Sequence, residues 1–193
     1  MTEPSLEFLA RRAEIVEVAA NVFRARGYDA GSLEDVAVAT GLRKASLYYY
    51  VRSKSELLHL VFDRAITIAL RRLTEIEEIT DPRERLAALI RHQVATVAAE
   101  PSLFTVFFDQ RPGLDPEHAR EIGEKERQYV RVLARAVSDA IAAGTVRNSH
   151  ARYGAQGILG MASWVYKWLD PARDDPEEVA EQFVLMVLGP PPA

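Results

Sequence analysis

The sequence predicts an all-α protein of about nine helices: a three-helix head with a helix-turn-helix at the N-terminus, followed by a larger helical body. Two observations carry this prediction. Apolar residues recur at helical spacing along most of the 193 residues, and no stretch shows the apolar–polar alternation of strands. Capping residues and glycines divide this pattern into segments of ordinary helix length. Because 48% of the residues are hydrophobic, the chain is able to bury a sizeable core.

Local signals mark the three helices of the head. The first helix is expected over about residues 6–26. Gly27 is expected to end it, because glycine is the usual residue directly after the C-terminus of a helix. Ser32, with an acid at the third helical position, predicts the N-cap of the second helix. Gly41 breaks that helix, and a short third helix follows over about residues 43–50.

The body begins at a capping box, in which Ser53 is followed three residues later by Glu56. Asp81 before Pro82 predicts another helix start, and Asn148 is expected to cap a later helix. Six helices are expected in the body, over about residues 53–79, 82–99, 101–111, 116–143, 148–169 and 176–188.

Composition argues against several classes of protein. The chain has no cysteine, which excludes disulfide scaffolds, thiolate zinc sites and cysteine nucleophiles. No apolar run is long enough to span a membrane. The N-terminal residues contain acids and no long apolar core, unlike a signal peptide, so we expect a cytoplasmic protein. Zinc-protease spacing, a nucleophile elbow, a phosphate loop and a dinucleotide fingerprint are all missing. We therefore expect no enzyme, no metal and no cofactor.

A local run of cations contrasts with the net charge of −4 of the whole chain. Arg43, Lys44, Arg52 and Lys54 occur in a stretch that has no acid between Asp35 and Glu56. A basic second helix behind a glycine turn suits the major groove of DNA. The alternatives are a solvated surface patch and, more distantly, a helical protein-interaction module without DNA binding.

Residues 15–58 resemble the TetR family of bacterial transcriptional repressors, in the segments FRARGY, SLEDVAVATGL and LYYYVRSKSELL. The chain departs from the family pattern at Val51, where phenylalanine is usual, and at Tyr50, where histidine is frequent. The resemblance implies a DNA-binding domain over residues 1–52 and a ligand-binding and dimerisation domain over residues 53–193. It also implies a homodimer on a palindromic operator in double-stranded DNA, although activators share this architecture.

Each candidate DNA-binding residue has a physical task. The first residues of a recognition helix are the ones that reach base edges. Arg43 or Lys44 is suited to bind a guanine, and Ala45 is suited to contact a thymine methyl group. Hydroxyl groups suit phosphates, with Ser32 alternatively a helix cap and Tyr48 alternatively a core residue. The candidates are Ser32, Arg43, Lys44, Ala45, Ser46, Tyr48, Tyr49 and Lys54, of which Lys54 resembles the family's phosphate-binding lysine.

Aromatic and polar residues of the body are candidates for an effector pocket, because such pockets are mainly apolar with a few polar groups. They are Gln93, Phe104, Phe107, Phe108, Arg111, Tyr129, Trp164 and Trp168. The alternative for each aromatic is plain core packing. The C-terminal segment, GMASWVYKWLDP to VLMVLG, is similar to family members that govern fatty-acid or sterol breakdown. That similarity implies a fatty acyl-CoA or sterol-derived acyl-CoA, against the alternative of an efflux regulator that responds to aromatic or cationic compounds.

The last two helices are candidates for a dimer interface. Glycines thin one of them, and an apolar stripe runs along the other, so two helices from each subunit are able to form a four-helix interface. The candidates are Gly157, Gly160, Val179, Phe183 and Val187. Alternatively, the glycines serve close packing within one subunit.

Overall fold

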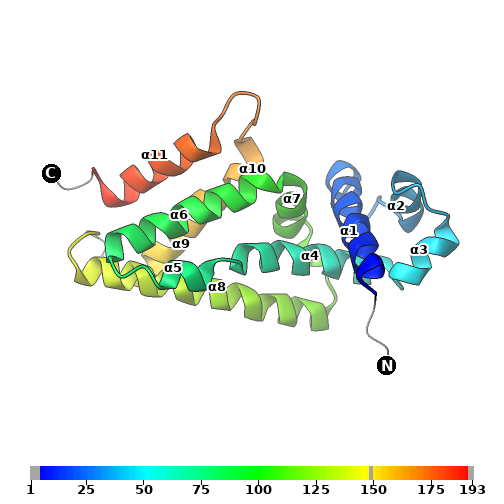
Figure 1. Ribbon diagram of the computed structural model, residues 1–193, viewed down its shortest axis with the longest axis horizontal. Helices are drawn as coiled ribbons and strands as arrows, with labels where there is room; N and C mark the ends of the chain where they lie inside the picture. Colours follow the sequence, from blue (N-terminus) through cyan, green and yellow to red (C-terminus); the bar gives the residue numbers. More distant parts are fainter. Residues whose placement is uncertain (1–4, 148–149, 191–193) are drawn as a thin grey trace. The chain divides into compact units, whose positions relative to one another are not determined.

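The computed structural model describes residues 5–147 and 150–190, and all regular structure in these residues is helical (Figure 1). The all-α prediction is therefore confirmed for the described residues. All nine expected helical segments appear, and two of them are divided, so residues 5–147 and 150–190 contain eleven α-helices and one 3-10 turn. The predicted cap Asn148 lies outside the described residues. The chain forms two compact units, of which the first ends at Ala65 but also contains Ser102–Ile122.

The first unit contains the three helices of the head. Its elements are α1 (Leu6–Arg26), α2 (Leu33–Ala39), α3 (Lys44–Tyr50), the first residues of α4 (Lys54–Leu70), most of α7 (Pro101–Asp109), the 3-10 turn η1 (Arg111–Gly113) and the start of α8 (Pro116–Ala142). Phe23 of α1, Val36 of α2 and Leu47 of α3 are fully buried, and α2 contacts both α1 and α3. Apolar burial of this kind holds α2 and α3, which have only seven residues each and would not be stable alone, against the longer α1.

Two glycines make the turns between the three head helices possible. Gly27 ends α1 with a φ of 77°, and Gly41 follows α2 with a φ of 68°. Backbone with positive φ is strained for residues that carry a Cβ, so glycine suits both positions. Leu42 then donates its N–H to the carbonyl of Ala37 at 2.8 Å, which closes the turn before α3.

The second unit holds the remaining helices. Its elements are the end of α4, α5 (Leu73–Glu77), α6 (Pro82–Ala99), the rest of α8, α9 (Ala151–Ser163), α10 (Val165–Trp168) and α11 (Pro176–Leu188). Helix α6 is its centre, because α5, α9, α10 and α11 all contact it, and α11 runs alongside it (Figure 1). Arg83 of α6 donates to the carbonyl of Leu188 at 2.7 Å and Arg91 pairs with Glu181, so polar bonds join α6 and α11 as well.

Two expected helices are interrupted. The segment expected over residues 53–79 breaks at Arg72, which adopts a left-handed φ of 72°. No glycine marks this position, so the sequence pattern did not predict the break. The segment expected over 148–169 divides at Trp164, which lies between α9 and α10 while keeping a right-handed helical backbone.

Candidate nucleic-acid interface

Ser32 caps the first helix of the helix-turn-helix motif. Its Oγ accepts the N–H of Asp35 at 3.1 Å, and the Asp35 carboxylate accepts the N–H of Ser32 at 2.9 Å. The predicted capping role of Ser32 is therefore confirmed. The Asp35 carboxylate also accepts a hydrogen bond from the Ser32 hydroxyl at 2.7 Å. This bond, followed by the one from the Ser32 N–H, is the main reason why the pKa of Asp35 lies below its usual value. A phosphate contact by Ser32 stays a prediction, and the free N–H groups of this helix start favour it.

Helix α3 presents its N-terminal residues to solvent. Arg43 occupies its N-cap position, and Lys44, Ala45 and Ser46 are all exposed, while Leu47 is buried against the other head helices. Base edges in a major groove are reached by the exposed first residues of a recognition helix. The arrangement therefore leaves the predicted reading residues accessible.

The tyrosines of α3 differ in their surroundings. The exposed fraction of Tyr48 is 48%, so this residue is neither a core residue nor a fully solvated one. Tyr49 is 73% exposed and lies edge-on to the ring of Phe8 in α1, with ring centroids 5.5 Å apart. Both hydroxyl groups stay predicted phosphate contacts.

A shallow hollow on the surface of the first unit brings four of the predicted residues together. Ser32, Lys44, Tyr48 and Lys54 line it, together with Asp29, Ala30, Gly31, Leu33 and Glu34. The two lysines and the two hydroxyl-bearing residues suit a phosphate, while the acidic residues Asp29 and Glu34 line the same hollow and offset the charge of the lysines. Glu34 was not anticipated from the sequence: its Oε2 lies 3.4 Å from Lys44 Nζ, so DNA has to compete for this lysine.

Lys54 links the start of α4 to the turn after α1. Its Nζ donates to the carbonyl oxygen of Asp29 at 3.1 Å and lies 4.4 Å from the centroid of the Tyr28 ring. The cation–π contact and the hydrogen bond both orient the ammonium group. The sequence predicted a cation at this place, whereas its two partners come from a segment about 25 residues earlier.

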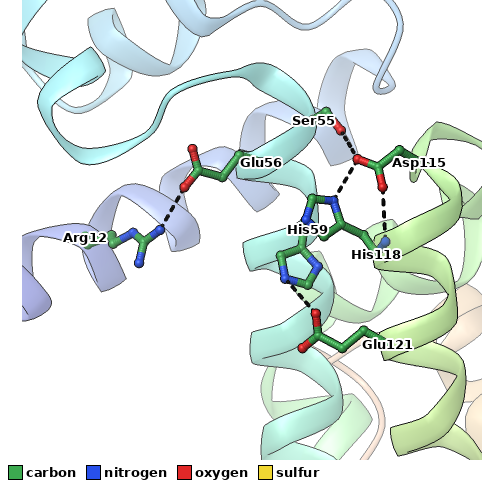
Figure 2. A network of polar contacts seen from close by, with 7 residues as sticks. All are labelled: Arg12, Ser55, Glu56, His59, Asp115, His118 and Glu121. Atoms are coloured by element: carbon green, nitrogen blue, oxygen red, sulfur yellow. Dashed lines mark hydrogen bonds and ion pairs between the residues drawn. The ribbon is translucent and has the colours of Figure 1, made fainter.

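The first turn of α4 is also tied to α1 (Figure 2). Ser53 Oγ accepts the N–H of Glu56 at 3.0 Å, which confirms one half of the predicted capping box. The Glu56 carboxylate does not complete the box at Ser53. It accepts the backbone N–H of Arg52 and pairs with Arg12 Nη2 at 3.1 Å. Glu56 thereby connects the helix that carries Lys54 to the first helix of the head.

On its other side, α4 meets the start of α8 through a polar cluster (Figure 2). Asp115 accepts from Ser55 Oγ at 3.1 Å and from the N–H of His118 at 3.0 Å, and this backbone bond is the main cause of its lowered pKa. The rings of His59 and His118 stack with centroids 3.8 Å apart, and His59 Nε2 lies 3.4 Å from Glu121 Oε2. This cluster was not predicted from the sequence, because its members come from two distant segments. The cluster therefore links the start of α8 to the first turns of α4, the helix that carries Lys54.

Two family models match this chain. Residues 15–61 match the bacterial regulatory proteins of the tetR family, and residues 80–190 match the tetracyclin repressor-like C-terminal domain. The chain belongs to the TetR family. The predicted family membership is thus confirmed, and the chain is a DNA-binding transcriptional regulator.

Individual TetR-type relatives are similar to this chain over 79–93% of its length. The crystal structure of AibR in complex with isovaleryl coenzyme A and operator DNA is 30% identical, covers 93% of this chain and 99% of that chain, and has a TM-score of 0.86. The HTH-type transcriptional repressor KstR2 of Mycolicibacterium smegmatis is 24% identical, with 93% of this chain and 90% of that protein covered. The fatty acid metabolism regulator protein of Bacillus subtilis is 23% identical, over 79% of this chain and 82% of its own length.

The candidate effector residues of this TetR-family chain are divided between the two units. In the first unit, Phe104 and Phe107 are buried, Phe108 is half-buried and Arg111 is exposed. Phe104 and Phe108 share a face of α7, with centroids 6.0 Å apart. An effector role for these four residues stays a prediction.

In the second unit, the remaining four candidates fall into two kinds. Gln93 and Tyr129 are buried, with exposed fractions of 5% and 4%. Trp164 and Trp168 are large exposed side chains, so in the isolated chain neither is part of a closed interior. Their assignment to the effector site also stays a prediction.

The candidate dimer residues lie on α9 and α11. Gly157 and Gly160 are exposed, and a Cβ built on either would have no atom within 4 Å. The alternative that these glycines serve packing within one subunit therefore finds no support in the described chain. Val179, Phe183 and Val187 are half-buried on α11, next to the exposed Leu185 and Met186.

Neither a metal-binding cluster nor a membrane-spanning helix occurs in the part of the chain that the structure describes. Residues 5–147 and 150–190 contain no group of three or more histidine, aspartate or glutamate side chains with the geometry to hold a metal ion. None of the helices in these ranges has the length and apolar character required to cross a membrane.

Proposed function

We propose that this chain is a transcriptional repressor that leaves its operator when it binds an acyl-CoA thioester. The hollow lined by Ser32, Lys44, Tyr48 and Lys54 carries the DNA-binding half of this proposal. Its cations and hydroxyl groups suit a backbone phosphate, and the exposed start of α3 beside it suits base edges. The DNA-binding domain is then residues 1–52, joined at the DNA by Lys54 from the first turn of α4, and the domain of residues 53–193 binds the effector and the second subunit.

The effector class is supported by the relatives. AibR, at 30% identity to this chain, was crystallised in complex with both isovaleryl coenzyme A and operator DNA. A relative from Bacillus subtilis is named as a regulator of fatty acid metabolism. A regulator of this kind works on DNA in the cytoplasm and catalyses no reaction of its own.

The proposed mechanism is a shift between two states of a dimer. The effector binds more tightly to a state whose two heads do not match the two half-sites, so operator affinity falls by the ratio of the two effector affinities. Within the first unit, Asp115 and Glu56 hold the first turn of α4 between the start of α8 and α1. This turn is the point at which the heads would be repositioned.

A release experiment tests the effector class. An operator is selected from a random duplex library, and its affinity is measured by fluorescence anisotropy with and without saturating isovaleryl-CoA. We expect operator affinity to fall by about 10-fold or more, within the usual range of allosteric coupling. Free coenzyme A is the control and is expected to have little effect. Unchanged operator affinity at saturating isovaleryl-CoA would show that acyl-CoA thioesters are not the effector class. Increased affinity would show that the effector does not release the protein from its operator.

Dimerisation through α9 and α11 is part of the proposal. The open surface above Gly157 and Gly160 allows another helix to approach the backbone closely. The neighbouring groove is lined by apolar side chains that include Ile158, Met161 and Met186. A second copy of the chain has the same groove, which a two-fold axis is able to pair with itself.

A leucine at Gly160 is expected to separate the dimer without unfolding the subunit. A Cβ built at this position meets no atom within 4 Å, so a side chain has room to leave the helix, and leucine is a better helix former than glycine. Light scattering after size exclusion is expected to report a monomer with unchanged helical circular dichroism. Gln128→Leu, which adds the same side chain to an exposed position of α8, is the control and should stay dimeric. A dimeric Gly160→Leu variant would place the interface elsewhere.

A further inference from the structure

Buried polar side chains lie in the second unit where α6 contacts α9. Gln93 and Thr96 of α6 and Ser163 of α9 are all less than 10% exposed. Gln93 Nε2 donates a hydrogen bond to Ser163 Oγ at 3.0 Å. Gln93 Oε1, in contrast, is buried and makes no hydrogen bond with any residue that the structure describes. The amide therefore uses its donor group and leaves its acceptor without a partner.

Tyr129 of α8 has a buried donor group, whereas Gln93 has a buried acceptor group. The residue is 4% exposed, and its hydroxyl is buried with no hydrogen-bond partner among residues 5–147 and 150–190. Burial raises the pKa of the Tyr129 phenol above its usual value, so the hydroxyl keeps its proton at physiological pH. It is therefore a hydrogen-bond donor without an acceptor.

Both atoms lower the stability of the chain without a ligand. A buried polar atom without a partner has lost its hydration and gained no hydrogen bond in return. Phenylalanine has nearly the shape of Tyr129 and methionine nearly that of Gln93, and neither carries this cost. Native proteins leave few such atoms, and a partner that arrives from outside the chain explains a buried atom that has none within it.

We propose that Tyr129 and Gln93 bind the polar groups of the effector. The Tyr129 hydroxyl donates to a carbonyl oxygen, and Gln93 Oε1 accepts from an N–H or O–H group. This inference rests on the proposed function, because an acyl-CoA thioester has both groups: its carbonyl oxygen accepts, and the amide N–H groups of its pantetheine arm donate. A hydrocarbon or a quaternary cation has neither, so the two side chains select against effectors of those classes.

Calorimetry with two ligands tests the role of Tyr129. Isovaleryl-CoA is compared with S-isopentyl-CoA, a thioether that has a methylene group in place of the carbonyl. The wild-type protein is expected to bind the thioester about 10-fold more tightly, and Tyr129→Phe is expected to bind the two ligands alike. Gln93→Met should weaken both ligands by the same factor, because they share the pantetheine arm. A Tyr129→Phe variant that keeps the preference for the thioester would overturn the proposal.

Thermal unfolding without ligand is an independent readout. Because phenylalanine lacks the unpaired hydroxyl donor, Tyr129→Phe is expected to raise the melting temperature by about 2–4 °C, although it binds the thioester less tightly. A lower melting temperature would mean that the hydroxyl has a partner inside the protein, and the proposal would be wrong. If the wild-type protein binds neither ligand, the effector class of the proposed function fails. In that case, a higher melting temperature of Tyr129→Phe still supports the proposal that the Tyr129 hydroxyl has a partner outside the chain. A lower melting temperature overturns that proposal.

Discussion

Replacing Arg43 with alanine is expected to weaken operator binding about 10- to 100-fold and to relax the sequence preference within each half-site. Arg43 is the exposed N-cap residue of α3, the end of the recognition helix that reaches base edges. A bidentate arginine–guanine pair contributes about 1–3 kcal/mol of discrimination against other bases. The loss should therefore be much smaller on random DNA than on the selected operator.

Lys54→Ala is the matched comparison, because a phosphate contact carries no sequence information. We expect this variant to weaken binding to operator and random DNA by similar factors and to reduce the salt dependence by about one counterion. Arg52→Ala removes the same charge from the same cation run and is the control for net charge. Fluorescence anisotropy on both duplexes at several salt concentrations measures all three variants. Equal losses on the two duplexes for Arg43→Ala would show that Arg43 does not read bases.

Gly113→Ala is expected to have the largest effect on stability, because the turn η1 packs its backbone against two side chains. A Cβ at this position would lie 2.6 Å from Tyr28 Cδ1 and 2.9 Å from Leu58 Cδ2. Leu58 is fully buried and has little room to move. Overpacking of this kind costs about 1–3 kcal/mol in the free energy of unfolding. Urea unfolding is expected to show a lower midpoint.

The same substitution should also weaken DNA binding, through Tyr28. Lys54 Nζ lies over the Tyr28 ring. The backbone N–H of Tyr28 donates to the Oε1 atom of Gln110 at 3.2 Å, and Gln110 is the residue directly before η1. A shifted ring moves the ammonium group that is predicted to meet a phosphate. Pro112→Ala, in the same turn with an exposed side chain, is the control and should change stability by less than about 1 kcal/mol. A Gly113→Ala variant with wild-type stability and operator affinity would mean that η1 can move away from Tyr28 and Leu58 at little cost, and the prediction would be wrong.

The head was predicted well because its signals are local. A capping serine such as Ser32 and turn glycines such as Gly27 and Gly41 act on atoms within a few residues, so their effect is readable from neighbouring sequence letters. The matching family model over residues 15–61 confirms the same stretch. The break at Arg72 was missed because no local residue preference accounts for a left-handed backbone there.

Candidate site residues were predicted by type but not by environment. Lys44 and Lys54 were expected to be cations of the DNA-binding surface, and the structure adds that each already has a partner in the chain. Trp164 and Tyr129 were grouped as aromatic candidates, whereas the structure places the first on the surface and buries the second with its hydroxyl unpaired. Burial depends on the packing of distant segments, which residue type does not report.

The sequence by itself determined the all-α class, the helix-turn-helix and the run of cations, because helical periodicity, caps and charge are properties of neighbouring residues. Only the tertiary structure decided which polar atoms find partners. It stacks His59 of α4 on His118 of α8, and it leaves Gln93 Oε1 and the Tyr129 hydroxyl without a partner in the described chain. The physical reason is that hydrogen bonds and desolvation act over a few ångströms in space, and residues so close in space are often far apart in the sequence.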